Sequence, residues 1–157
     1  MELPDKAVNF LKRQSFVIVS TIDSEGRIHS SCKGIVGINE KGKVFIVDLY
    51  HNRTYRNLKN DSRISITQID ERRFTGYTLS GQAKIVLRED IHSDYIKEWE
   101  NKVLKRISDR IIKSVQDGKS SASHYEAELP EYPQYLIEIE VEKITDISHP
   151  CRGEEEK

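Results

Sequence analysis

Hydrophobic and polar positions alternate along much of the chain in short runs, a pattern that predicts β-strands separated by turns. The turns DSEGR and NEKGK carry glycine where the chain is expected to reverse. Strands are predicted at residues 15–23, 28–38, 44–50, 63–69, 76–87 and 135–147. The last segment, YLIEIEVEKITDI, alternates apolar and charged residues and so predicts a strand with one face in water.

Two short segments have the spacing of helices. Residues 3–14 predict a helix, because Pro4 suits a first helical turn and apolar residues recur on one face. Residues 53–61 predict a short helix or helical turn with Leu58 as its apolar anchor. Both helices therefore lie at the ends of strands rather than between layers of a sheet.

A longer helix is predicted after Glu89, where apolar residues recur at three- and four-residue spacing over about seven turns. These residues are Ile96, Trp99, Val103, Ile107, Ile111 and Val115. Their stripe places Trp99 in the helix core rather than on a stacking platform. A polar connector bearing proline, residues 117–134, then leads to the last strand.

These elements predict a mainly β (α+β) fold, a small six-stranded antiparallel barrel with its helices at the ends. At 157 residues the chain is long enough to bury one core. Glycines inside strands mark bulges or close approaches, and Gly81 is expected at a bend. We expect one domain over residues 1–149 and a loosely ordered tail at 150–157.

Composition narrows the class of protein. The formal net charge is −1 with 32% charged residues, which argues against a generic nucleic-acid or membrane-surface binder. No apolar run approaches the roughly 20 residues of a membrane helix, and the first residues lack the pattern of a secretory signal. Cys32 and Cys151 give no disulfide framework, so we expect a reducing, cytoplasmic location.

A cluster of hydrogen-bond donors follows the third predicted strand, at residues 51–59. The start of a helix leaves free backbone N–H groups that favour an anion, and here Arg53 adds a guanidinium and Thr54 a hydroxyl. Asn57 follows about one turn later. The pattern predicts a phosphate monoester site, although a solvated basic turn with Asn52 as an ordinary N-cap fits it too.

The second strand, HSSCKGIVG, is rich in small residues. Few side chains would prevent a flat ligand from lying against its backbone, and Lys33 would be within reach of an electron-rich ring edge. The alternative is a barrel strand whose small residues fit a tight corner. The histidines and cysteines have no zinc-ligand spacing, and no nucleophile elbow, Walker loop or GxGxxG is present. We therefore expect no metal site and assign no catalytic residue.

Several motifs occur in an order that resembles the FMN-binding split barrels, the superfamily of pyridoxamine 5′-phosphate oxidase. A helix precedes FVIVST, the turn in DSEGRIHSSCKG leads into a strand, and NEKGKVFIV introduces the next. The block RTYRNLKNDSRISI is similar to the basic and asparagine-containing block of the family, and SGQAKIV resembles the strand that follows it. The resemblance covers residues 4–90 well and the remainder weakly.

The resemblance implies a split barrel that binds FMN, or a deazaflavin instead, at a homodimer interface. Arg53 and Thr54 would hold the phosphate, with Asn57 in the asparagine position of the block. The strand that borders the ring would contribute Ser31, Cys32 and Lys33, and the strand beside the ribityl chain Val47 and Asp48. Arg73 is a further candidate near the start of the fifth strand.

The chain also departs from the oxidases themselves. Ser31 and Val36 stand where the oxidases place an arginine and a lysine, and ISHPCRGEEEK lacks their Arg-x-His pair. Pyridoxamine phosphate is therefore not the expected substrate. The resemblance implies an FMN-binding oxidoreductase with an unidentified substrate and a small-molecule electron donor or acceptor.

Two alternatives remain at this point. The first is a non-catalytic flavin or haem binder, or an electron carrier, on the same barrel. The second is a cofactor-free barrel that uses residues 51–59 against nucleic acid, which the balanced charge disfavours.

Overall fold

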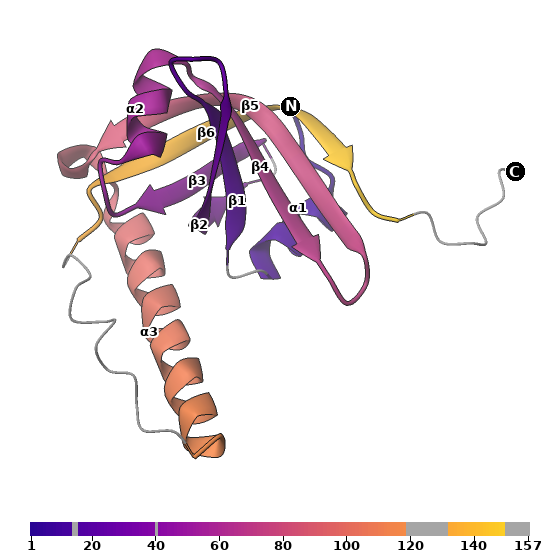
Figure 1. Cartoon of the computed structure of the whole chain (residues 1–157), viewed down its shortest axis with the longest axis vertical. Helices are drawn as coiled ribbons and strands as arrows, with labels where there is room; N and C mark the ends of the chain where they lie inside the picture. Colours follow the sequence, from indigo (N-terminus) through magenta and orange to yellow (C-terminus); the bar gives the residue numbers. More distant parts are fainter. Residues whose placement is uncertain (14–15, 40, 119–131, 150–157) are drawn as a thin grey trace, which may run out of the picture.

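The structure, a computed structural model, describes residues 1–13, 16–39, 41–118 and 132–149. Six antiparallel strands close into a barrel in the order β1-β2-β3-β6-β5-β4 (Figure 1). Their bounds are Val17–Ile22 (β1), Ile28–Ile38 (β2), Lys43–Asp48 (β3), Arg63–Asp70 (β4), Thr75–Leu87 (β5) and Tyr135–Asp146 (β6). The predicted six-stranded antiparallel barrel, with a short helix first and a long helix before the last strand, is confirmed.

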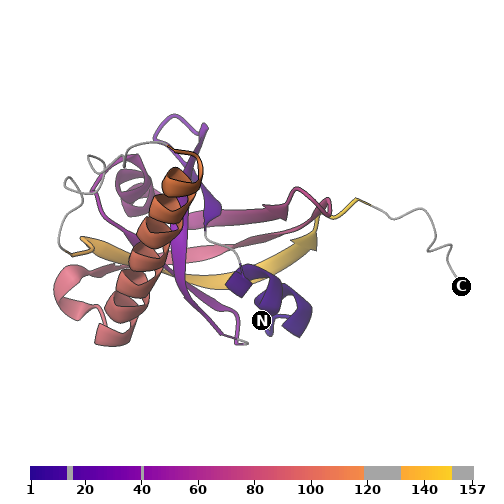
Figure 2. The same ribbon diagram turned by 90° about the horizontal axis from the view of Figure 1, so that it is seen from below.

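The helices are α1 (Asp5–Arg13), α2 (Arg53–Asn60) and α3 (Ser93–Gln116), with a short 3₁₀ helix, η1, at Arg88–Asp90. The buried face of α1 belongs to the barrel core, as the spacing of its apolar residues predicts. Figures 1 and 2 show α1 and α3 against different parts of the barrel. The barrel surface therefore carries two separate helix-flanked regions.

Alternation along the strands creates the barrel core. In β1, Val17, Val19 and Thr21 are buried and the residues between them are half-buried. Apolar side chains from all six strands, α1 and α2 join in one cluster, to which each fully buried side chain contributes about 1.5–3 kcal/mol. The bend predicted at Gly81 is present as a register shift between β5 and β6. A Cβ at Gly81 would overlap the Glu140 carbonyl oxygen, so only glycine fits there.

A second apolar cluster lies under α3. It is formed by Val36, Phe45, Val47, Ile91 and Leu136, and the first part of α3 packs on it through Tyr95, Ile96 and Trp99. The side chain of Trp99 is half-buried there, so the predicted packing role holds with the outer side of the ring in water.

The apolar stripe predicted along α3 faces the barrel only over the first part of the helix. Farther along, Ile111 and Val115 are 48% and 73% exposed, and the helix runs beyond the strands (Figure 1). Over this part α3 extends away from the barrel, so its apolar side chains have no strand of the described barrel to pack on (Figure 1). The sequence predicts the stripe itself, and the structure shows which part of it packs on the barrel.

Some predictions fall outside the described residues. They concern Gln14, most of the connector (119–131), Cys151 and the tail at 150–157. Within the described ranges, no helix is both long and apolar enough to cross a membrane.

Candidate functional site

A hollow of about 220 Å³ lies between β2, β3 and α3, and we call it the β2–β3–α3 hollow. Its walls include Cys32, Lys33, Val47, Asp48, Trp99 and Arg106. The strands bring the first four together because β2 and β3 pair antiparallel, with Gly34 opposite Val47. Four of the eight residues assigned to a cofactor from the sequence therefore line one cavity.

Asp48 is the most heavily bonded side chain of the hollow. Its Oδ2 lies 2.7 Å from the Lys33 ammonium and accepts a hydrogen bond of 2.5 Å from the Tyr135 hydroxyl. Its Oδ1 accepts from the Leu49 amide at 2.9 Å. With every bond directed to protein groups, the carboxylate holds Lys33 in place rather than reaching outward.

Tyr135 keeps its proton in this environment. Burial, together with the hydrogen bond to the Asp48 carboxylate, raises the pKa of Tyr135 far above its ordinary value. Its ring meets Tyr55 edge-on at 5.0 Å between centroids, and His51 lies 4.4 Å from Tyr55. Three aromatic side chains, those of Tyr135, Tyr55 and His51, thus connect Asp48 to the start of α2.

The first turn of α2 adjoins the same part of β2. The Ser31 and Thr54 hydroxyls are 3.1 Å apart and join the strand to the helix. Asn52 occupies the N-cap position in an extended conformation, but its side chain makes no capping hydrogen bond. Arg53 is exposed and forms no ion pair or hydrogen bond within the described part of the chain. Backbone N–H groups and one guanidinium are thus free to meet an anion here.

Two other predicted residues lie elsewhere. Asn57 is buried and its Nδ2 donates to the Thr21 hydroxyl at 3.0 Å, so its amide nitrogen ties α2 to β1. Arg73 lines a different hollow beside α1. The structure thus joins Ser31 to Thr54, the residue after Arg53, and places Asn57 and Arg73 elsewhere.

Sequence reasoning missed the contributions of α3 and β6. Trp99 and Arg106 both line the hollow, and they share a helix face because they are seven residues apart. The sequence shows this spacing, but it does not show which strands the helix face covers. Tyr135 gave no signal beyond its place at the start of a strand.

The arrangement has two parts that differ in chemistry. The start of α2 offers donors and a cation for a compact anion, and the hollow offers backbone, Cys32, Val47 and Trp99 for a flat surface. A volume of about 220 Å³ is smaller than the roughly 300–1,000 Å³ of typical ligand pockets. Among the described residues, no group of His, Cys, Asp and Glu is placed to hold a metal ion.

Comparison with solved structures supports the fold. The chain resembles Group A Streptococcus HupZ, with a TM-score of 0.62, 17% identity and coverage of 93% of this chain and 94% of that chain. It resembles a Clostridium acetobutylicum protein related to general stress protein 26 of B. subtilis (pyridoxinephosphate oxidase family), with a TM-score of 0.59, 15% identity, and coverage of 92% and 87%. A structure named F420 reductase has a TM-score of 0.59, 12% identity, and coverage of 91% and 98%.

These identities establish a shared fold alone. The comparison with curated proteins gives no match. The family model described as pyridoxamine 5′-phosphate oxidase matches residues 3–146, which is most of the chain. The chain therefore belongs to the pyridoxamine 5′-phosphate oxidase family, whose split barrel it has.

Proposed function

We propose that this protein binds FMN and acts as an oxidoreductase in the form of a homodimer, on a substrate other than pyridoxamine phosphate. One observation carries the proposal. Ser31 joins β2 to the first turn of α2, and the next two residues of β2, Cys32 and Lys33, line the β2–β3–α3 hollow. An anion bound at the start of α2 and a ring bound in the hollow would then both lie along β2, as a ligand with a phosphate at one end and a ring system at the other requires.

The residues at the start of α2 fit a phosphate. Arg53 has its guanidinium in solvent without a protein partner in the described chain, whereas Thr54 is only 3% exposed and its hydroxyl is held against Ser31. A dianionic ester would receive a charged hydrogen bond from Arg53 and amide hydrogen bonds from the helix start. The side chain of Asn52 does not compete, because it makes no capping bond.

The β2–β3–α3 hollow fits one face of the flavin ring. Gly34 has no side chain, and a Cβ there would be in ordinary contact with the Arg106 guanidinium at 3.7 Å, so only a side chain larger than alanine would fill this space. Trp99 supplies an aromatic wall and Arg106 a cation. Because a single chain encloses only about 220 Å³, a second copy is the natural source of the remaining wall.

When bound, FMN would supply hydride or electron transfer. The residues of the chain would position it. Arg53 and Thr54 would fix the phosphate, the β2 backbone would cover one face of the ring, and Lys33 would remain fixed by Asp48 and Tyr135. No residue of the hollow is assigned as a general acid or base.

A deazaflavin in place of FMN is the main alternative cofactor, supported by the resemblance to the structure named F420 reductase. A non-catalytic flavin or haem binder, or an electron carrier, would use the same barrel. The oxidoreductase and the non-catalytic binder differ in whether they turn over. An oxidoreductase reduces its bound flavin with NADH or NADPH and reoxidises it with an acceptor over many cycles, whereas a carrier or storage protein does not.

The visible spectrum of the freshly purified protein tests the cofactor class. Flavin bands that remain with the protein through gel filtration support the proposal. A colourless protein that takes up neither FMN nor a deazaflavin on titration overturns it. Haem bands instead of flavin bands would favour the haem alternative.

A second experiment tests where the phosphate binds, using FMN and riboflavin, which differ by the phosphate alone. Arg53→Ala should weaken FMN binding by about 1.5–3 kcal/mol, the range for a charged hydrogen bond, and leave riboflavin binding unchanged. Arg56→Ala is the matched control, since Arg56 is also an exposed arginine of α2. Equal FMN affinities in the two variants would remove Arg53 from the site.

A further inference from the structure

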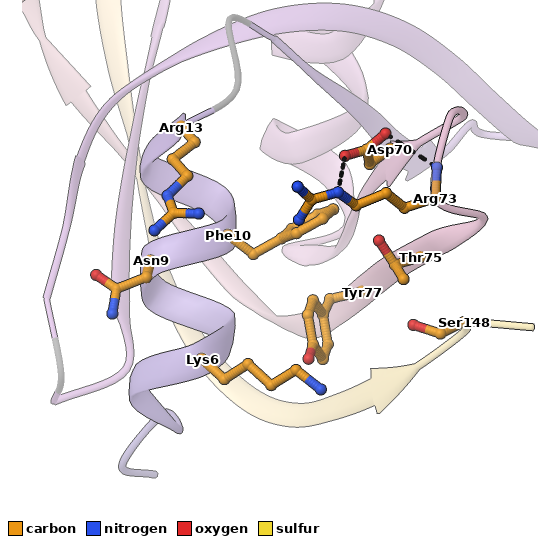
Figure 3. A pocket seen from close by; sticks show the side chains of 9 residues that line it. All are labelled: Lys6, Asn9, Phe10, Arg13, Asp70, Arg73, Thr75, Tyr77 and Ser148. Atoms are coloured by element: carbon orange, nitrogen blue, oxygen red, sulfur yellow. Dashed lines mark hydrogen bonds and ion pairs between the residues drawn. The ribbon is translucent and has the colours of Figure 1, made fainter. Parts of the chain in front are cut away.

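A larger hollow of about 380 Å³ lies on another part of the barrel, between α1 and the turn that joins β4 to β5. We call it the α1–hairpin hollow. The residues that line it include Lys6, Phe10, Arg13, Asp70, Arg73 and Tyr77 (Figure 3). None of them lines the β2–β3–α3 hollow, so the two cavities are separate.

Cations reach the α1–hairpin hollow from both sides. Lys6 and Arg13 lie on α1, and Arg73 lies on the β4–β5 turn. Figure 3 shows the Arg73 side chain extended from the turn toward α1, and the Lys6 side chain extended from α1 toward Tyr77. The chain as a whole is balanced, with 25 basic and 26 acidic residues, so this convergence of cations is local.

The carboxylates nearby do not fully balance these cations. Asp70 is the acid that lines the hollow, and its Oδ1 accepts the turn amides of Arg72 and Arg73 at 3.0 and 3.3 Å. Its Oδ2 is 3.9 Å from the Arg73 guanidinium, at the limit of an ion pair. Beside the hollow, Asp146 accepts the Ser148 amide at 2.9 Å and lies near Lys6. Three cations thus face two carboxylates that are already bonded to backbone amides.

Aromatic rings form an apolar wall in the same hollow. Phe10 and Tyr77 meet edge to face, with ring centroids 5.4 Å apart and an interplanar angle of 74°. Tyr77 is 7% exposed and belongs to the barrel core, whereas Phe10 is partly exposed. The hollow therefore combines an aromatic wall with cations from α1 and from the β4–β5 turn.

We infer that the α1–hairpin hollow is a second ligand site, which takes a small aromatic anion such as an aryl phosphate or aryl carboxylate. The ring packs on Phe10, and the anionic group is held by Arg73 and Arg13 or Lys6. A volume of about 380 Å³ is within the range of small-molecule pockets. The site lies on one chain and is independent of the flavin proposal.

Isothermal titration calorimetry of the full chain with 1-naphthyl phosphate tests the inference. The protein is used as purified, and the titration is repeated with Arg53→Ala, in which a probe bound at the phosphate position of α2 would bind more weakly. Inorganic phosphate and 1-naphthol are titrated in parallel to separate the contributions of charge and ring. The variants are Arg73→Gln and Arg13→Gln. Arg72→Gln is the matched control, because Arg72 is the exposed neighbour of Arg73 and does not line the hollow.

The expected result is saturable binding of one naphthyl phosphate per chain, weakened about tenfold in Arg73→Gln and unchanged in Arg72→Gln. Arg53→Ala should not alter it, which separates a failure here from a failure of the flavin site. The Arg73 side chain is 77% exposed, so loss of binding in this variant cannot be ascribed to unfolding. Absence of saturable binding, equal losses in Arg72→Gln and Arg73→Gln, or equal affinity for inorganic phosphate would overturn the assignment.

Discussion

The Lys33 ammonium lies 2.7 Å from the Asp48 carboxylate, and the two side chains are only 15% and 5% exposed. Both ions have lost most of their hydration, so their attraction is offset by desolvation. Such a pair adds little net stability compared with an apolar pair, yet loss of one partner leaves the other charge buried and unbalanced. Because the pair also lines the β2–β3–α3 hollow, it links the stability of the barrel to the shape of the proposed site.

Asp48→Asn should therefore lower the free energy of unfolding by about 3–5 kcal/mol, the cost of an uncompensated buried ion. The amide keeps the shape of the side chain but removes the charge that balances Lys33. Urea unfolding followed by circular dichroism measures the change.

The matched control for Asp48→Asn replaces both ions. The double variant Lys33→Met with Asp48→Asn should be clearly more stable than Asp48→Asn alone, because it leaves no buried charge and keeps an oxygen that accepts from the Tyr135 hydroxyl. If Asp48→Asn unfolds at the same urea concentration as the unmodified chain, the pair is not shielded from water as the structure shows.

Because of Tyr135, the free energy of unfolding should depend on pH in the alkaline range. Its pKa in the folded state is raised far above 10 by burial and by the Asp48 carboxylate, so above pH 10 the unfolded chain loses this proton while the folded protein keeps it. The stabilisation that Tyr135 provides is complete below the unfolded pKa. It should then fall by about 1.4 kcal/mol per pH unit above pH 10.

Comparison with Tyr135→Phe isolates this effect from the titration of the other tyrosines and of lysines. At pH 8 the unmodified protein should be more stable than the variant by about 1.5–3 kcal/mol, the range for a hydrogen bond to a charged group. That advantage should shrink as the pH rises from 10 to 11. An advantage that stays constant over this range would contradict the raised pKa.

Residues of the site that are close together in the sequence could be predicted, and residues that are far apart could not. Residues 31–34 and 47–54 come together through a hairpin and a strand-to-helix turn, and both connections can be read from local patterns. The predictions for Ser31, Cys32, Lys33, Val47 and Asp48 rested on this local order and on the family resemblance. Their roles toward a cofactor stay predictions.

The contributions from distant segments could not be predicted in the same way. Tyr135 meets Asp48 across 87 positions because β6 pairs with β3, a pairing that no local signal specifies. The spacing of Trp99 and the other apolar residues of α3 indicates a helix face. It does not indicate which strands that face covers. The family pattern was weakest over these segments, and so the wall of the hollow that comes from α3 and the support that Asp48 receives from β6 were missed.

Gly34 offers a test of the hollow that leaves the phosphate position untouched. Gly34→Val would project methyl groups into the space between the strand and Arg106, and FMN affinity should fall by roughly tenfold or more through crowding. Gly34→Ala is the matched control, because its Cβ would lie at an ordinary contact distance of 3.7 Å from Arg106. Fluorescence titration of FMN measures both. An unchanged affinity in Gly34→Val would mean that the ring does not lie at this strand.

The exposed end of α3 provides the test of the proposed homodimer. Leu104, Ile111 and Val115 share one face of the helix, since they are seven and four residues apart, and all three are exposed in the single chain. Contact with a second copy would remove this apolar face from water.

Val115→Glu should then raise the dimer dissociation constant by roughly tenfold or more, because a carboxylate would be buried without a partner. Gln116→Glu adds the same charge at the next, polar position and should leave the dimer intact. Analytical ultracentrifugation with FMN absorbance would record assembly and cofactor together. Identical behaviour of the two variants would show that subunits do not meet at this face of α3.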